Sequence, residues 1–192
     1  MLVRAAELEG MAERRGGLGA AVGSALAHDE FSDWQADLVC AALPCEEGAW
    51  HEGAVSPDDA RWAALGVPPR NKATFAWIEQ AMFHQAKGGL TVLLAPNCAL
   101  HSCVGSETEL RRKLATSGRV RAVVSLPSRI FADGRPASSL IVLGDPRDAE
   151  SAQTLMIDML GCGVPSGGTG AAATRELPAE VAARAACVLA AW

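Results

Sequence analysis

Residues 68–97, PPRNKATFAWIEQAMFHQAKGGLTVLLAPN, constrain the fold of this chain more than any other segment. The pattern predicts a loop, an amphipathic helix over residues 72–86 and a buried strand over residues 90–95. Asn71 is the expected N-cap, and Gly88-Gly89 the expected stop of the helix. Phe75, Ile78 and Met82 share one face of the helix, so they are expected to lie in the core.

The remaining chain alternates strands and helices in the same way. An apolar run predicts a strand at 37–42, and the capping-box pattern Ser106–Glu109 opens a helix to about Thr116, with a left-handed cap at Gly118. Further strands are expected at 120–126, 137–143 and 153–158, the last at an edge, with a final helix from Pro178. The alternation indicates an α/β sheet with right-handed parallel crossovers. The strand at 137–143 follows its predecessor too closely for a crossover helix, so it is an antiparallel insertion.

The length of 192 residues suits a single domain, residues 1–192, with its own core. Within it, residues 1–19 are predicted to hold an N-terminal helix and a connector, 46–70 a long loop, and 161–176 a flexible glycine-rich segment. Trp50 and Trp62 lie in the long loop. They are expected to anchor it on the body, the alternative being that they supply a stacking ring.

Charge and hydropathy limit the binding partners and the cellular location that can be expected for this chain. The net charge of −5 disfavours autonomous binding to a nucleic-acid backbone. The candidates for a local basic patch are mostly expected to be a solvated face; they are Arg111, Arg112, Lys113, Arg119, Arg121, Arg129 and Arg135. No signal peptide and no membrane-spanning run is evident, so a cytoplasmic location with reduced thiols is expected.

The cysteines allow two interpretations. Cys40, Cys162 and Cys187 are expected to be small packing residues. Cys45, Cys98 and Cys103 would lie beyond the ends of adjacent strands, where a metal is conceivable. Zinc motifs more often use closer cysteine pairs, so no metal is predicted.

Seven segments, taken in order, resemble a known family: DLVCAALPC, NKATFAWIEQAMFH, GGLTVLLAPNCAL, ELRRKL, VRAVVSLPSRIF, GRPASSLIVL and TLMIDM. Their order and spacing resemble the adenine-specific (N6) DNA methyltransferases, in particular the modification subunit of type I restriction-modification systems. The resemblance runs from about residue 20 to residue 192. It implies the C-terminal part of a Rossmann-like S-adenosylmethionine-dependent methyltransferase fold, with a mixed, mostly parallel sheet.

The resemblance also places the family's catalytic motif, Asn-Pro-Pro-Phe (or Tyr), at Ala42, Leu43, Pro44 and Cys45. In the family the target adenine is flipped out of the duplex. The asparagine oxygen and a proline carbonyl then hold its amine, and the aromatic ring stacks on the base. Ala42 offers no acceptor, Leu43 lacks the proline ring, and Cys45 has no ring to stack. Each lost group costs roughly a hundredfold in rate, so little activity is expected.

The family's cofactor loop is the second departure. The family binds S-adenosylmethionine through a glycine-rich loop that follows the first strand. In this chain Gly16-Gly17-Leu18-Gly19 has no apolar strand before it, so a helix stop is predicted there. The isolated chain is therefore expected not to bind the cofactor, and no cofactor-binding residue is assigned.

A truncated sheet has a physical consequence. The strand at 37–42 is expected beside the strand at 90–95, with no neighbour on its other side. The N-terminal segment, a second copy or another polypeptide would cover that edge, which predicts a homo-oligomer or a complex with restriction-system subunits, and DNA contact only within a complex. Two functions stay open: an impaired DNA adenine methyltransferase, and a non-catalytic interaction module or gene remnant.

Overall fold

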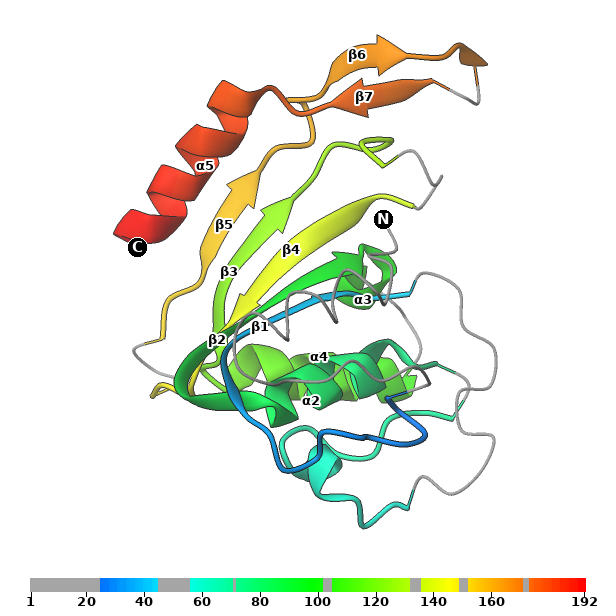
Figure 1. Cartoon of the computed structure of the whole chain (residues 1–192), viewed down its shortest axis with the longest axis vertical. Coiled ribbons are helices and arrows are strands. Elements are labelled where there is room, and N and C mark those ends of the chain that lie inside the picture. Colours follow the sequence, from blue (N-terminus) through cyan, green and yellow to red (C-terminus); the bar gives the residue numbers. More distant parts are fainter. Residues whose placement is uncertain are drawn as a thin grey trace, which may run out of the picture.

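A computed structural model describes residues 25–44, 56–70, 72–101, 105–131, 136–148, 152–170 and 173–192. Five strands form one mixed sheet in the order β1-β2-β4-β3-β5 (Figure 1). Their bounds are Ala36–Ala42 for β1, Gln85–Pro96 for β2, Val120–Ser125 for β3, Ser138–Leu143 for β4 and Leu155–Asp158 for β5. All five strands agree with the segments expected from the sequence.

The pairing of these strands confirms the expected topology. β1 runs parallel to β2, and β3 runs parallel to β5. β4 is antiparallel to both of its neighbours, β2 and β3. The described part of the connection before β4 holds no helix, whereas a parallel return is usually made by a crossover helix.

Helices cover both faces of the sheet (Figure 1). Their bounds are Thr74–Phe83 for α2, Cys98–His101 for α3, Gly105–Thr116 for α4 and Ala179–Ala191 for α5, with a 3₁₀ helix η1 at Ala60–Ala63. Leu93 packs in one core cluster with α2 and α4, whereas its neighbour Leu94 packs in a second cluster with α5. Adjacent strand residues point to opposite faces, so α2 and α4 lie on one face and α5 on the other.

The apolar face predicted for the first long helix is confirmed. Phe75, Ile78 and Met82 are all buried in α2. The predicted cap is wrong, because the N-cap is Ala73, which makes no side-chain cap hydrogen bond. Asn71 itself lies outside the described residues.

The predicted role of the two glycines is also wrong. α2 ends at Phe83, and β2 already begins at Gln85, so Gly88 and Gly89 lie inside a strand. The register of β1 on β2 shifts at this point, which marks a bulge. Gly88 has a φ of +82°, and a Cβ on Gly89 would lie 2.9 Å from the carbonyl oxygen of Asp37. The glycines therefore permit a tight bend of β2 against β1.

The helix predicted from the capping-box pattern is present as α4, but the box is not used. Ser106 lies inside the helix, which begins at Gly105, and Glu109 pairs with Arg112. The left-handed cap at Gly118 is confirmed by its φ of +67°. A Cβ there would collide with the carbonyl oxygen of Arg147.

Two segments predicted to be irregular hold secondary structure. The described part of the long loop contains η1, in which Trp62 is buried, as expected for an anchor. The glycine-rich segment 161–176 forms a hairpin of β6 (Val164–Gly167) and β7 (Thr174–Glu176). Gly168 and Gly170 have positive φ and lie between the two strands, where the turn needs left-handed backbone.

Other expectations have mixed outcomes. The last helix follows Pro178 as predicted. Cys162 is half-buried in the second core cluster, but Cys40 and Cys187 are exposed, so packing was the wrong interpretation for those two. The N-terminal helix and connector predicted for residues 1–19, and Trp50, lie outside the described residues. None of the described helices has the length and apolarity that a membrane span requires.

Candidate functional site

The turn that closes β1 is the first candidate site. Ala42 pairs with Leu94 at the end of the parallel ladder, and the Leu43 N–H continues that ladder by donating to the Leu94 carbonyl oxygen at 2.9 Å. The Leu43 side chain is 1% exposed and belongs to the core cluster under α2. Pro44 is exposed, and Cys45 lies outside the described residues.

This geometry differs from what a proline at position 43 would allow. Proline has no N–H, so it could not make the hydrogen bond to Leu94. Leu43 stabilises the turn in two ways, through its hydrogen bond to Leu94 and through its buried side chain. The side chains at 42–44 carry no polar atom, so this part of the turn offers no side-chain acceptor for the amine of a target adenine. These side chains therefore do not fit that base.

The end of the neighbouring strand offers no substitute acceptor. Ser139 Oγ donates to Asn97 Oδ1 at 2.8 Å, and the Asn97 N–H donates to the Ala137 carbonyl oxygen. The Leu100 N–H donates to the Asn97 carbonyl oxygen at 2.9 Å, at the turn between β2 and α3. The side-chain oxygen, the backbone N–H and the carbonyl oxygen of Asn97 thus join β2, β4 and α3.

The three-cysteine metal site is not tested. Cys98 is exposed at the start of α3, whereas Cys45 and Cys103 lie outside the described residues. Within the described ranges, no three His, Cys, Asp or Glu side chains come together as metal ligands.

A polar network that sequence reasoning missed holds the segments on either side of β1. Arg61 in η1 binds the Asp59 carboxylate through Nε and Nη2, at 2.6 to 3.0 Å. Its Nη1 donates to Gln80 Oε1 on α2 at 2.7 Å and to the Ala25 carbonyl oxygen at 3.1 Å. The hydrogen bond from Arg61 is the main reason that the pKa of Asp59 is lowered. The sequence carried a signal in Asp59, which accepts from the Arg61 N–H as the N-cap of η1.

His84, at the end of α2, extends the network toward β1. Its Nδ1 lies 2.8 Å from the Trp34 carbonyl oxygen, and its Nε2 lies 2.8 Å from Asp29 Oδ2. Gln80 Nε2 also donates to Asp29 Oδ2 at 2.8 Å. Burial opposes ionisation of Asp29, but hydrogen bonds from Gln80, the Phe31 N–H and His84 lower its pKa overall. The chain on both sides of β1 is thereby fixed to α2.

Glu79 is the most perturbed acid. Its side chain is fully buried on α2, and Oε1 accepts from the Leu65 N–H at 2.9 Å. Burial raises the pKa of Glu79 to about 7, although backbone hydrogen bonds and the charge of Lys113 oppose the shift. Lys113 Nζ donates to the Leu65 carbonyl oxygen at 2.7 Å. Glu79 of α2 and Lys113 of α4 thus both hydrogen-bond to the backbone of Leu65. Perturbed acids cluster at functional sites, but this one lies under a loop and serves the structure.

The candidate basic residues mostly bind backbone carbonyl groups instead of forming a free patch. Arg119 and Arg121 donate to the carbonyl oxygens of Gly144 and Asp145. Arg129 donates to Gly170, and Arg112 pairs with Glu109. Arg135 lies outside the described residues. These contacts leave little of the predicted face to bind a phosphate backbone.

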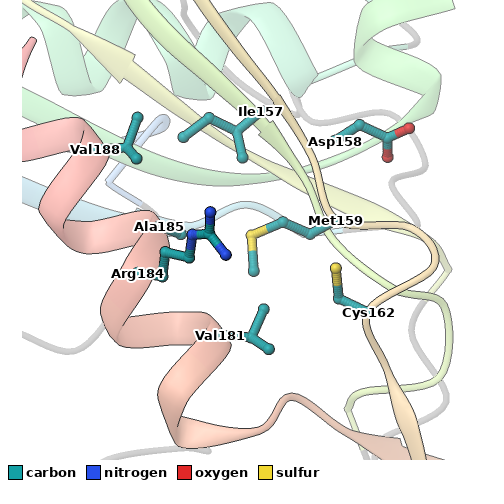
Figure 2. Close-up of a pocket in the computed structure, with 8 residues that line it drawn as sticks. All are labelled: Ile157, Asp158, Met159, Cys162, Val181, Arg184, Ala185 and Val188. Atoms are coloured by element: carbon teal, nitrogen blue, oxygen red, sulfur yellow. The ribbon is translucent and has the colours of Figure 1, made fainter.

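A second candidate site is an apolar groove between α5 and the end of β5 (Figure 2). Its volume is about 190 Å³. The lining residues are Ile157, Asp158, Met159, Cys162, Val181, Arg184, Ala185 and Val188. The groove lies at the opposite edge of the sheet from the β1 turn.

Comparison with solved structures identifies the fold. It matches part of S-adenosylmethionine-dependent methyltransferase subunits. The methyltransferase subunit of the type I restriction-modification system from Streptococcus thermophilus superposes with a TM-score of 0.76 at 18% identity, over 91% of this chain and 36% of that one. The M protein of the type I restriction enzyme EcoKI superposes with a TM-score of 0.52 at 16% identity, over 77% of this chain and 30% of that one.

Sequence comparison then gives the family. The model of the N-6 DNA methylase family matches residues 10–166, so the chain belongs to that family. The methylase subunit of the type I restriction enzyme HindI from Haemophilus influenzae is 30% identical over 99 residues, which are 52% of this chain and 22% of that protein. The chain thus spans about a fifth of the length of this curated relative, and both α5 and β7 lie beyond the family match.

Proposed function

We propose that this chain is the part of a type I DNA adenine-N6 methyltransferase that carries the strand beside the target base, and that residues 1–192 by themselves transfer no methyl group. The β1 turn supports the proposal. Ala42 replaces the acceptor amide, and Leu43 fastens the backbone to Leu94 and to the core. Adenine-N6 transfer from S-adenosylmethionine needs donors and acceptors fixed around the reacting amine, and these two residues supply no such side chain.

S-adenosylmethionine, the methyl donor that the fold class implies, is also expected not to bind to the isolated chain. Isothermal titration of residues 1–192 with S-adenosylmethionine is the direct test, with a complete type I modification enzyme as the positive control. We expect no saturable heat from the chain. A dissociation constant tighter than about 100 µM, equivalent to more than about 5 kcal/mol of binding free energy, would overturn this part of the proposal.

The transfer step is tested separately. The chain is incubated with labelled S-adenosylmethionine and unmethylated DNA, and the label is followed into N6-methyladenine. We expect no incorporation above a DNA-free control. Incorporation above that control would refute the assignment of an inactive site.

A second function, a non-catalytic interaction module, is supported by the outer edge of β1. Among the described residues β1 pairs only with β2, so no described strand pairs with its other edge. Leu38 is 58% exposed on this strand, and Trp34, just before it, is 52% exposed. Unpaired strand edges with apolar side chains add strands from other polypeptides. We propose that the partner is a second copy or a restriction-system subunit, and that DNA is bound only within such a complex.

Amide hydrogen exchange along β1 tests this second function. Protection of both alternating sets of β1 amides in the assembled protein, and its loss in Leu38→Lys, is the expected result. A monomer whose outward-facing β1 amides exchange rapidly would rule out an intermolecular cover.

A further inference from the structure

The composition of α5 does not match its burial. The helix AEVAARAACVLAA carries only two charged residues, Glu180 and Arg184, and is otherwise apolar. A helix that is apolar around its whole circumference is normally buried. All thirteen residues of α5 are described, and none of them is buried.

One narrow stripe fixes this helix to the sheet. Val181, Ala185 and Leu189, spaced four residues apart, pack against the cluster of Val124, Leu126 and Met159. Beyond this stripe, Val188 is 44% exposed at the groove and Trp192, at the end of the helix, is 55% exposed. The helix therefore leaves large apolar side chains, not only alanines, exposed.

The groove beside this stripe is suited to a side chain of another polypeptide. Its volume of about 190 Å³ falls below the range of roughly 300–1,000 Å³ that holds small-molecule ligands. Aliphatic and sulfur-containing side chains line most of it, and Figure 2 shows the Arg184 guanidinium lying over it.

The two charges of α5 are self-complementary. Glu180 and Arg184 are four residues apart, a spacing that allows an ion pair along a helix. No ion pair or hydrogen bond joins Arg184 to any other described residue, and both side chains are exposed. In an antiparallel pair of α5 helices, a two-fold axis can pass between Glu180 and Arg184. Glu180 of each copy then lies opposite Arg184 of the other copy.

We propose that α5 and the groove beside it form the interface between two copies of this chain. The helices pack antiparallel about a two-fold axis, and Arg184 meets Glu180 of the partner subunit. The apolar surface that α5 leaves open is buried in the dimer. This interface lies on the other face and at the other edge of the sheet from the β1 turn, so it does not depend on the function proposed for that turn.

Sedimentation equilibrium of the 192-residue chain, between about 1 and 100 µM, tests the dimer by mass action. Wild type is expected to be dimeric at the upper concentrations. Glu180→Arg and Arg184→Glu each replace two attractive contacts by two repulsive ones, so each is expected to weaken the dimer by about tenfold or more. The double variant, Glu180→Arg with Arg184→Glu, is expected to restore the affinity to within about threefold of wild type.

Matched charge reversals on α4 provide the control. Glu109 and Arg112 form an exposed ion pair one turn apart, so Glu109→Arg and Arg112→Glu are expected to leave the dimer unchanged. Circular dichroism confirms that each variant is folded. A wild-type chain that stays monomeric at 100 µM refutes the proposal. So does a dimer that the single reversals leave intact, or one that the double variant fails to restore.

Discussion

α2 and α5 are both apolar helices on the same sheet, yet their surroundings differ. Seven of the ten residues of α2 are buried, including the polar Glu79 and Gln80, whereas none of the thirteen residues of α5 is buried. α2 lies between the sheet and the segments that Arg61 and His84 tie to it. α5 has the sheet on one side and no described element on the other. Apolar composition thus specifies that a helix will be covered, but not by which molecule.

The largest expected effect tests the buried side of this comparison. Phe75→Ala removes a fully buried ring from α2 and leaves a cavity between the helix and the sheet. We expect the free energy of unfolding to fall by about 3–5 kcal/mol, as measured by urea denaturation. A loss below about 1 kcal/mol would mean that this region is less tightly packed than described.

An intermediate effect concerns the acid buried on α2. The folded-state pKa of Glu79 is raised from 4.5 to about 7, so the folded protein holds this proton more tightly than the unfolded chain does. The stabilisation is complete below about pH 4.5 and is lost as the pH rises through 7. The free energy of unfolding of the wild type should fall by about 2–3 kcal/mol between pH 5 and 8 through this group, and Glu79→Gln should remove that fall.

Unfolding measured at a series of pH values checks this expectation. Glu109→Gln, at an exposed carboxyl on α4, is the matched control and should leave the profile unchanged. An unchanged profile in Glu79→Gln would show that Glu79 is not the group that titrates in this range.

The smallest effect tests the exposed side of the comparison. Leu189 is one of the three residues of the α5 stripe and is half-buried. Leu189→Ala should cost about 1 kcal/mol in the monomer, well below the cost of Phe75→Ala, because the vacated space opens to solvent. Equal losses for the two variants, measured at a concentration where the chain is monomeric, would remove the distinction between the helices.

Local patterns explain why much of the fold was predictable. The strands at 37–42 and 90–95 are short apolar runs, and the insertion at 137–143 follows from the length of a single loop. The two glycines at 88 and 89 were misplaced, because their need arises from the backbone of β1, about fifty residues earlier in the chain. The Arg61 network escaped notice for the same reason, since Ala25 and Gln80 are distant in sequence from Arg61.

The candidate site was predictable only as a position. The family pattern located the turn at Ala42 and Leu43, and the lack of polar side chains there is evident from the letters alone. That Leu43 donates to Leu94 and fills the core required the structure, because both contacts come from another strand and from α2. The expected position of Cys45 and Cys103 beyond the ends of adjacent strands, by contrast, stays a prediction.

By itself the sequence determined which segments form the strands of the main sheet and the helices α2, α4 and α5, which strand is inserted antiparallel, and which chemical groups the β1 turn cannot offer. These properties depend on side-chain identity and on spacing along the chain, which are local. Only the tertiary structure decided that Glu79 is buried, that Gly88 and Gly89 accommodate a bulge, and that α5 is left uncovered. Burial and close approach are set by whichever distant elements pack together, and no local pattern records them.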